Sequence, residues 1–403
     1  MPMMVYNETI KGPKGDAMNA FETKQYRNVF AEIGKTEAEI EAKLRQIVAT
    51  FFYGKEDERI YFPAGEDMGY LEDTGNHDAR TEGMSYGMMM CVQLNMKEEF
   101  DRIWKWSKTH MYMDEGINEG YFAWSCKVTG EKNAYGPAPD GEEFYAMALF
   151  FASHRWGDGE GIFNYSHEAR EILRACIHKG ENGRPGHPMW NRDNKQILFV
   201  PGSPHTDPSY HLPHFYELFA LWAYEEDRAF WREAVKASRD YLAIACHPET
   251  GLNPEYGNFD GTPYSVVPHW DKVAHDNFYS DAYRTAANIG LDAEWFGKEA
   301  KHLGAPLRMM KFFGTDLEAV RCVFTVDGQP LERPVLHPVG LLATTAQGAL
   351  TVPCKAGDPD WETAAQWVEW FWNQPLRKGG RRYYDNCLYL FAFLALSGKY
   401  RIW

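Results

Sequence analysis

Helical segments of two kinds alternate along the chain, and this alternation constrains the fold more than any other feature. We expect helices at 37–52, 83–95, 98–113, 142–156, 166–179, 211–224, 227–245, 281–291, 295–312, 337–350, 359–373 and 381–397. The second segment and every other one after it are almost continuously apolar, as in RRYYDNCLYLFAFLALS at 381–397. The remaining segments, such as 227–245, are amphipathic. A helix that is apolar on every face must be buried, so the pattern predicts an inner and an outer layer of helices.

The lengths of the connections alternate in the same way. Links from an inner to the following outer helix are mostly short, as at 95–98 and 225–227, whereas links back to the inner layer are long. The long ones are 53–81, 113–141, 179–210 and 246–280. Ordinary connections between helices are short, so long loops at one end favour the walls of a binding cleft. The sequence therefore predicts an all-α fold, an (α/α)6 barrel with its cleft at the N-terminal ends of the inner helices.

A few local signals refine this prediction. Thr36 and Glu39 form a capping-box pattern before the first helix, and Pro306 should break or shorten the segment 295–312. Strand-like alternation is limited to short pieces, Gln196–Val200 and Ala319–Val326. Although 403 residues are enough for two or three domains, the chain shows no linker. We expect a single catalytic domain over 1–403, with 1–25 as an N-terminal extension.

Composition narrows the class of partner. The net charge of −15 argues against nucleic acid and anionic lipid, because phosphate binding needs a basic patch. Aromatic residues make up 15 % of the chain, and an acidic, aromatic-rich protein suits a neutral ligand such as a sugar. Many of these aromatic residues must nevertheless be ordinary core.

The cysteines and the hydropathy pattern bear on location. The seven cysteines are scattered, several of them inside apolar helical segments, and they lack zinc-type spacing. This usage is typical of a reducing compartment. No stretch resembles a signal peptide or reaches transmembrane length. We expect a cytoplasmic protein that does not bind membranes and has no evident obligate protein partner.

The stretch Asp73–Met90, DTGNHDARTEGMSYGMMM, turns abruptly from polar to apolar and places a carboxylate at the mouth of a buried helix. Thr81 is a plausible N-cap, and Glu82 follows it in the first turn. One reading is that Glu82 merely favours the helix dipole. The neighbouring carboxylates, with Arg80 and His77, favour a functional site instead.

In the predicted barrel three acids, Glu82, Asp140 and Asp281, come from the N-terminal ends of alternate helices. Two carboxylates across a cleft are what glycoside hydrolysis needs, one to protonate the departing oxygen and one to activate water or attack. A helix N-terminus favours the ionised form, which suits Asp281 as a base. Glu82 would need burial or a like charge, such as that of Asp140 or Asp73, to act as an acid. Taken singly, each acid also fits a helix cap.

A metal site is the next alternative. Possible ligands are the pairs His205 with Asp207, His211 with His214, and His275 with Asp276. No HExxH motif or paired cysteines support zinc, and a histidine among aromatic residues is by default structural. The sequence also shows no GxGxxG or GxxxxGK motif and no GxSxG elbow between a strand and a helix, which leaves nucleotide binding and serine hydrolysis unsupported. We expect neither a metal nor a cofactor.

Together, several motifs resemble glycoside hydrolase family 8. They are RTEGMSYGMMM around Glu82, GPAPDGEEFYAMALFFASHRWG around Asp140, DPSYHLPHFYELF, FYSDAYRTAANIGLDAEW around Asp281, LHPVGLLAT and RRYYDNCLYLFAFLALSG. The resemblance spans 26–403 and is strongest to the members that release xylose from the reducing end of oligosaccharides. It implies an (α/α)6 barrel and hydrolysis with inversion. The segment 264–277 departs most from the family pattern.

The resemblance also assigns roles. It implies that Glu82 is the general acid, Asp281 the general base, and Asp140 the third acid, which binds and distorts the sugar next to the scissile bond. The other residues that the resemblance implies in substrate binding are Arg80 and Trp124 along the sugar path, Tyr210 at the attacking water and His337 at the reducing-end hydroxyl. Arg284, Tyr383 and Tyr384 are further candidates, because they stand in polar clusters at the N-terminal ends of expected inner helices. The acid and base carboxyl groups should then stand roughly 6.5–9.5 Å apart, with room for water between them.

The leading hypothesis is an inverting glycoside hydrolase that releases xylose from the reducing end of β-1,4-xylo-oligosaccharides. Within the same family, the alternative is an endo-acting β-1,4-glycanase of the xylanase, cellulase or chitosanase type. A sugar-binding barrel without catalytic activity, and a metal-dependent enzyme of another barrel family, are the hypotheses from different classes.

Overall fold

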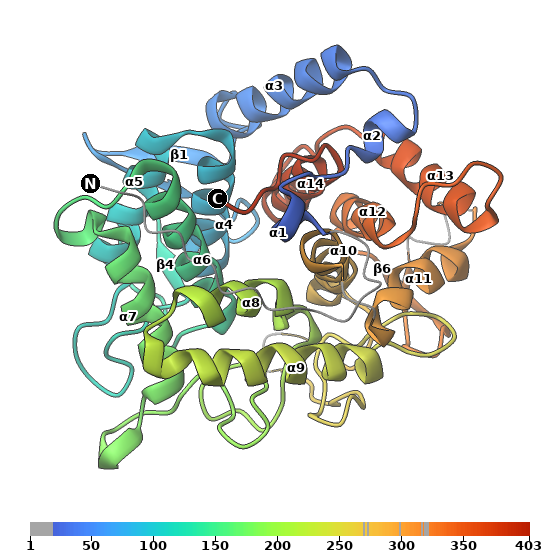
Figure 1. Ribbon diagram of the computed structural model, residues 1–403. Helices are drawn as coiled ribbons and strands as arrows, with labels where there is room; N and C mark the ends of the chain where they lie inside the picture. The colour runs from blue at the N-terminus through green and yellow to red at the C-terminus, as the bar shows by residue number, and fades with distance from the viewer. Residues whose placement is uncertain (1–18, 269–270, 272–273, 298–299, 316, 318–321) are drawn as a thin grey trace.

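A computed structural model describes residues 19–403 except 269–270, 272–273, 298–299, 316 and 318–321. Within that part of the chain, six inner helices form a ring and six outer helices surround it. Figure 1 shows the two layers. The inner helices are α4 (Thr81–Leu94), α6 (Pro139–Trp156), α8 (Pro213–Trp222), α10 (Arg284–Phe296), α12 (Pro338–Gln347) and α14 (Arg382–Leu396). The outer helices are α3 (Glu37–Tyr53), α5 (Lys97–Trp106), α7 (Tyr165–His178), α9 (Arg228–Ala245), α11 (Ala305–Phe313) and α13 (Pro359–Asn373). The prediction of an (α/α)6 barrel is confirmed.

The two layers follow from the burial of their side chains. Every residue of α14 is buried, whereas α5 buries Phe100, Ile103, Trp104 and Trp106 and turns its charged residues outward. Each inner helix contacts the next one along the chain, and α14 contacts α4, which closes the ring. The apolar helices thus fill the centre and the amphipathic helices cover it.

Short strands lie in the connections between helices. β1 (Tyr61–Ala64) pairs with β2 (Met68–Leu71), β3 (Asp78–Arg80) with β4 (Ser125–Lys127), and β5 (Cys322–Phe324) with β6 (Pro330–Pro334), all antiparallel. β5 falls inside the expected stretch 319–326, of which 319–321 lie outside the described residues. The stretch 196–200 forms no named strand, only an isolated bridge between Ile197 and Trp190. The other strands are too short to show alternation in the sequence.

Some helix boundaries differ from those expected. The capping box of Thr36 and Glu39 is present, but Thr81 is the first helical residue rather than the N-cap, and Arg80 precedes it without a side-chain cap bond. The segment expected at 98–113 ends as an α-helix at Trp106 and continues as a π-turn. The expected segment 295–312 begins only at Ala305, because Pro306 fits the first turn of a helix but not its interior.

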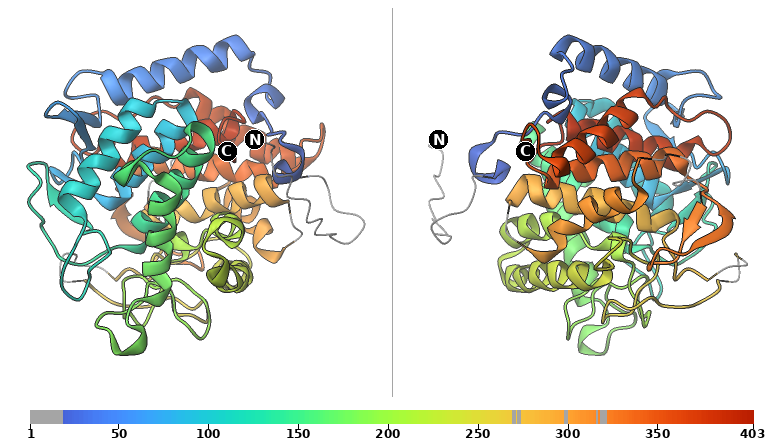
Figure 2. Two further views of the ribbon diagram at one scale, coloured as in Figure 1. Left: turned by 60° about the vertical axis from the view of Figure 1, so that its left-hand side comes forward. Right: turned by 90° about the vertical axis from the view of Figure 1, so that its right-hand side faces the viewer.

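The two ends of the barrel carry different elements. In the right-hand view of Figure 2, the helices lie across the picture, with α1 (Ala20–Thr23) and the C-terminus at one end and the β5–β6 hairpin at the other. At the first end, Phe21 of α1 stacks on Phe296 at the close of α10, with ring centroids 5.3 Å apart. α2 (Val29–Glu32) follows it along the chain. The single-domain boundary at 1–403 stays a prediction, and residues 1–18 lie outside the described part.

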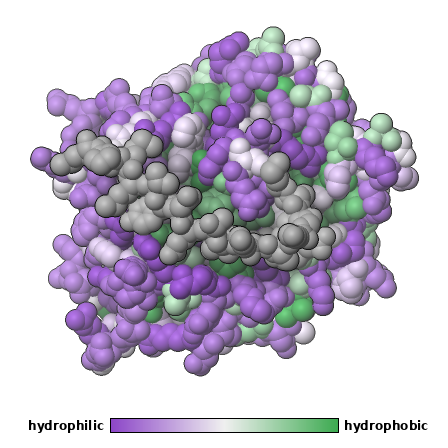
Figure 3. Space-filling model, viewed as in Figure 1, coloured by the Kyte–Doolittle hydropathy of each residue, from purple (hydrophilic) through white to green (hydrophobic). Residues whose placement is uncertain are grey.

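The hydrophilic surface is consistent with an apolar core between the helical layers. The face seen in Figure 3 is largely hydrophilic where it is coloured, and green patches show mainly between the purple side chains. Of the helices in the described residues, none combines the length and the apolar character needed to cross a membrane.

Close packing of the inner ring can be tested at Gly290 on α10. A Cβ atom there would lie 2.6 Å from the backbone oxygen of Gln347 on α12, closer than any real contact. We expect Gly290→Ala to lower the free energy of unfolding by about 1–3 kcal/mol, as over-packing of a core typically does. Thermal denaturation would measure this, with Gly136→Ala as the control, because no heavy atom lies within 4 Å of a Cβ there. Equal melting temperatures for the two variants would contradict the packing.

Candidate active site

A single guanidinium collects the three predicted acids. Arg284 Nη1 donates to Glu82 Oε2 at 3.2 Å and to Asp140 Oδ2 at 2.9 Å, and Nη2 lies 3.2 Å from Asp281 Oδ2. Each acid is the second residue of its element: α4, α6 and the 3-10 turn Ser280–Tyr283 that leads into α10. Acids far apart in the sequence therefore meet at one end of the barrel, as predicted.

Glycine residues allow the helix ends to come this close. A Cβ at Gly141, next to Asp140, would lie 2.5 Å from the Cβ of Thr81, so α6 approaches α4 only because this side chain is missing. A Cβ at Gly83 would overlap the hydroxyl of Tyr383. Without that obstacle, Tyr383 reaches Glu82 and donates to its Oε1 at 2.9 Å. The two glycines beside the acids thus decide how the carboxylates are placed.

The environment of Glu82 suits a general acid. The pKa of Glu82 is raised to about 8, mainly by burial and in addition by the charges of Asp281 and Asp140, against the opposing effects of Arg284 and Tyr383. A carboxyl group with this pKa is protonated near neutral pH and can give its proton to a departing oxygen. The compensation that the sequence could not reveal is therefore burial first and like charge second.

Asp281 is placed differently. Its side chain is 27 % exposed, compared with 16 % for Glu82, so water reaches it more easily. The two carboxylates touch the two terminal nitrogens of one planar guanidinium, so their contacting oxygens are at most roughly 9 Å apart. This limit is compatible with the roughly 6.5–9.5 Å of inverting glycosidases.

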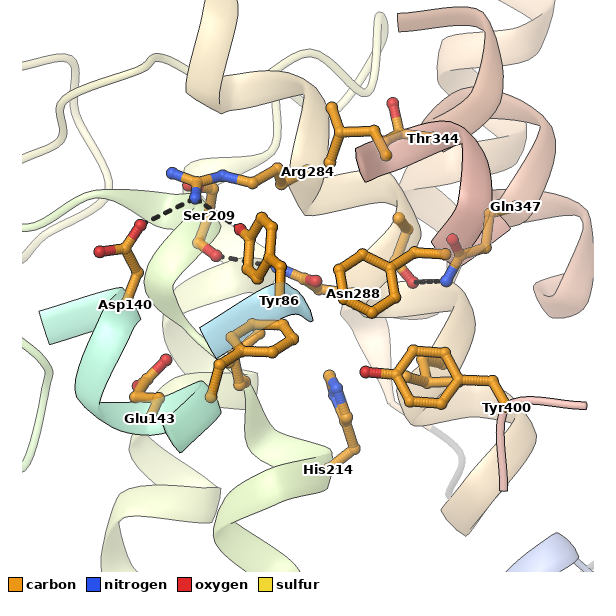
Figure 4. A pocket seen from close by; sticks show the side chains of 16 residues that line it. Tyr86, Asp140, Glu143, Ser209, His214, Arg284, Asn288, Thr344, Gln347 and Tyr400 are labelled. Carbon is orange, nitrogen blue, oxygen red and sulfur yellow. Dashed lines mark hydrogen bonds and ion pairs between the residues drawn. The ribbon is translucent and has the colours of Figure 1, made fainter. Parts of the chain in front are cut away.

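Asp140 lies deeper than the other two acids and ties Arg284 to the barrel interior. Burial raises the pKa of Asp140, and Arg284 opposes that rise. Figure 4 shows Asp140 and Arg284 facing each other, and Arg284 Nη1 also donates to the hydroxyl of Tyr86 at 2.8 Å. On the inner side of these residues a cavity of about 30 Å³ reaches His214 and Gln347. Arg284 is 4 % exposed, so its position is fixed from several sides.

Arg80 and Trp124 form a platform beside Glu82. Arg80 Nε lies 3.1 Å from Asp73 and 3.0 Å from Asp78, and its guanidinium stacks over the Trp124 ring at 5.2 Å. The pairing of β3 with β4 brings the two together, and Trp124 keeps 38 % of its surface exposed. An indole face held in this way can stack on a sugar ring.

The remaining predicted residues lie on the other sides of Arg284. Its guanidinium is 5.4 Å from the Tyr210 ring and 5.9 Å from the Tyr384 ring. The His337 ring is 4.7 Å from Tyr384, and its Nδ1 is 3.1 Å from Asp385 Oδ2. The ten predicted residues thus lie around the N-terminal ends of the inner helices.

Two buried carboxylates beside Asp281 received no catalytic role from the sequence. Asp207 is fully buried and accepts the backbone N–H of Ser209 at 2.7 Å. Glu255 accepts the backbone N–H of Asp281. Asp207 stands in the DPSY cluster and could have been found there, whereas Glu255 lies inside a long loop and carries no motif.

Two of the histidines considered as metal ligands, His205 and His211, hydrogen-bond to hydroxyl groups. His211 Nδ1 and Nε2 face the hydroxyls of Ser238 and Thr206 at 2.7 and 3.0 Å, and His205 Nδ1 faces Ser203 at 2.8 Å. Among the described residues, no group of three or more potential ligands is arranged to hold a metal ion. The expectation that the protein uses no metal or cofactor stays a prediction.

Two carboxylates that meet at one end of a helical barrel, one of them with a raised pKa, have the chemistry that glycoside hydrolysis needs. Residues 67–325 match the sequence model of the family described as "Glycosyl hydrolases family 8". It is 56 % identical over 385 residues, 95 % of this chain and 96 % of the relative, to the reducing end xylose-releasing exo-oligoxylanase of Halalkalibacterium halodurans. The chain belongs to family 8 of the glycosyl hydrolases.

A solved relative and a more distant group complete the comparison. Rex8A from Paenibacillus barcinonensis, complexed with xylose, superimposes with a TM-score of 0.90 at 54 % identity, covering 96 % of this chain and 99 % of that one. Endoglucanase 2 of Ruminiclostridium josui is only 26 % identical over 338 residues, 81 % of this chain and 65 % of that protein.

The hydrogen bond from Tyr383 to Glu82 gives a pH-dependent prediction. This bond favours the ionised carboxylate and so lowers the pKa of Glu82. Because the acid works in its protonated form, activity should fall as pH rises through that pKa, and Tyr383→Phe should move this alkaline limb to higher pH. The pH profile of kcat/KM measures the shift. Tyr389→Phe on the same helix, where the hydroxyl donates to the Gln374 carbonyl, is the control; a limb that Tyr383→Phe leaves in place would contradict the contact.

Proposed function

We propose that the protein is an inverting exo-acting hydrolase that releases xylose from the reducing end of β-1,4-xylo-oligosaccharides. The observation that carries this proposal is the meeting of Glu82 and Asp281 around Arg284, with burial raising the pKa of Glu82 to about 8. Names of relatives above 50 % identity over nearly the whole chain support the choice of substrate.

The reaction uses the two acids in turn. Glu82 donates its proton to the glycosidic oxygen as the bond from that oxygen to the anomeric carbon breaks. Asp281 takes a proton from the water whose oxygen attacks the same carbon from the opposite face. The product sugar therefore carries the inverted configuration, and Glu82 ends ionised while Asp281 ends protonated. A proton exchange with solvent restores both groups.

The other residues bind and orient the sugar. Asp140, held by Arg284 at 2.9 Å, is assigned to the ring next to the scissile bond, and Tyr210 to the attacking water. Trp124 and Arg80 provide the stacking platform along the chain of sugars. Positioning of this kind converts a bimolecular attack into an intramolecular one.

His337 is assigned to the reducing-end hydroxyl. The Asp385 carboxylate, 3.1 Å from Nδ1, fixes one edge of the His337 ring. The Tyr384 ring packs against the imidazole and limits its rotation. The ring then presents Nε2, for which no partner is found among the described residues. An imidazole fixed at this point supports exo action, since it would close the cleft beyond the last sugar.

The endo-acting alternative has weaker support. Endoglucanases of the family are similar to this chain at 24–26 % identity, about half the value of the exo-oligoxylanases. A catalytic function is favoured over a sugar-binding barrel because a buried acid with a raised pKa costs stability that binding alone does not require. A cytoplasmic location is also proposed, supported by the free cysteines of the described residues.

Product analysis tests the proposal. Xylotriose should yield xylose and xylobiose, and the same sugar with its reducing end converted to the alditol should react at least tenfold more slowly, because the reducing-end hydroxyl is no longer part of a ring. Proton NMR at early times should show the α-anomer at the newly formed end of xylobiose.

Glu82→Gln supplies the control for both assays, since it keeps the shape of the acid without its transferable proton. Equal cleavage of the reduced and unreduced substrates would favour the endo-acting alternative. Appearance of the β-anomer first would contradict inversion, and undiminished hydrolysis by Glu82→Gln would contradict the assignment of the acid.

A further inference from the structure

The buried carboxylate of Glu255 lies against the turn that carries Asp281, and the mechanism above does not use it. Glu255 is 3 % exposed, and its backbone N–H donates to the carbonyl of Asn277 at 2.9 Å. Burial is the main cause that raises the pKa of Glu255 to about 7, and hydrogen bonds from His275 and from the backbone N–H of Asp281 oppose that rise. A carboxylate is costly to bury unless it is paired and hydrogen-bonded, so its presence beside the base calls for a reason.

The backbone at this point is strained. Ser280 has φ = 41°, in the left-handed region that side-chain-bearing residues rarely adopt. Ser280 directly precedes Asp281, so its conformation decides where the N–H and the side chain of Asp281 point. Strain of this kind persists only where surrounding contacts fix it, and it concentrates at functional sites. The bond from the Asp281 N–H to Glu255 is such a contact, strengthened by the charge of its acceptor.

A series of alternating charges holds Glu255 in turn. His275 Nδ1 lies 2.8 Å from Glu255 Oε2, and His275 Nε2 lies 3.2 Å from Asp271 Oδ2. Arg333 of β6 pairs with the same Asp271 oxygen at 3.0 Å and lies over the Tyr279 ring at 4.0 Å. With a carboxylate at each ring nitrogen, His275 is favoured as the imidazolium, which can donate from both. The charged groups thus connect the β5–β6 hairpin to the backbone of the base.

We propose that Glu255, held by His275, is a positioning residue that fixes Asp281 for its attack on water. The inference rests on the proposed function, in which Asp281 is the general base. Arg284 Nη2 holds the Asp281 side chain at 3.2 Å, and Glu255 holds its backbone from the other side. A general base displaced by 1 Å loses up to about a hundredfold in rate, so the second contact has a measurable consequence.

Two substitutions of Glu255 test this role. Glu255→Gln keeps an acceptor oxygen but loses the charge that pairs with His275, and it should lower kcat about tenfold with KM within about twofold. Glu255→Ala removes the acceptor as well and should lower kcat about a hundredfold. Steady-state kinetics on xylotriose measure both, and the split between kcat and KM separates a misplaced base from lost substrate binding.

Rescue by azide tests whether the loss of activity in Glu255→Ala comes from an impaired general base. The azide anion forms a bond to the anomeric carbon while the bond to the leaving oxygen breaks and Glu82 protonates that oxygen, so no proton need be taken from the nucleophile. Sodium azide should therefore restore much of the rate of Glu255→Ala and give a glycosyl azide of inverted configuration. It should not restore Glu82→Gln, which lacks the acid.

Glu294→Gln is the matched control. Glu294 is a partly buried carboxylate that accepts the backbone N–H of Arg27 at 2.6 Å, and it lies at the opposite end of α10 from Asp281. The variant loses the same kind of contact away from the base, and its kcat should stay within about twofold of the parent. The melting temperatures of Glu294→Gln and of the Glu255 variants show how much of any loss in kcat comes from general destabilisation.

The outcomes separate this inference from the proposed function. Asp281→Ala should itself respond to azide, and if it does not, the assignment of the base fails. If Asp281→Ala responds but Glu255→Ala does not, or if the kcat of Glu255→Ala equals that of Glu294→Gln, the positioning role of Glu255 is wrong. Should Glu255→Ala not fold, the kcat and azide response of Glu255→Gln decide in the same way.

Discussion

The buried guanidinium of Arg284 is the interaction on which the site depends. Three carboxylates from α4, α6 and the turn before α10 would repel one another at this distance, and Arg284 pairs with all three. Arg suits this task because its planar group offers several donors in fixed directions and stays charged. The barrel supplies the geometry, since its closure brings three distant helix ends to one point. Removal of the charge would leave the acids without a counterion in a buried place.

The same cluster gives two acids different environments. Burial dominates at Glu82 and raises its pKa to about 8, while Asp281 keeps 27 % of its side chain exposed. Two titratable groups whose environments differ in this way are the mark of an acid and base pair. Asp140 contributes a third charge from deeper in the barrel, so ionised Asp140 also disfavours the loss of a proton from Glu82. These environments support the proposed acid and base roles, which residue type alone leaves equal.

Much of the fold could be predicted because burial leaves a strong pattern. A helix such as 382–396, with every residue buried, has no polar face and reads as an inner helix from its sequence. The short strands could not be predicted, since three or four residues show no alternation. The position of Thr81 was mistaken for a cap because N-cap preference is only statistical, and here its side chain packs against Gly141 instead.

The positions of the three acids could be predicted from the sequence, but the contacts that hold them could not. Glu82, Asp140 and Asp281 share a position at the start of inner elements, which pattern and family resemblance both indicate. What keeps Glu82 protonated depends on burial and on distances across the barrel, which no local pattern records. Glu255 was missed for the same reason, because its contact joins a long irregular loop to the turn that carries Asp281.

The most direct test of the account is the titration of Glu82 itself in the enzyme without substrate. Carbon NMR of protein labelled at the glutamate carboxyl groups would identify its signal as the one missing from Glu82→Gln. The account predicts that this signal titrates at about pH 8, far above the value of 4.5 for an ordinary glutamate. A midpoint near 4.5 would mean that Glu82 is ionised at neutral pH, and the assignment of the general acid would then be contradicted.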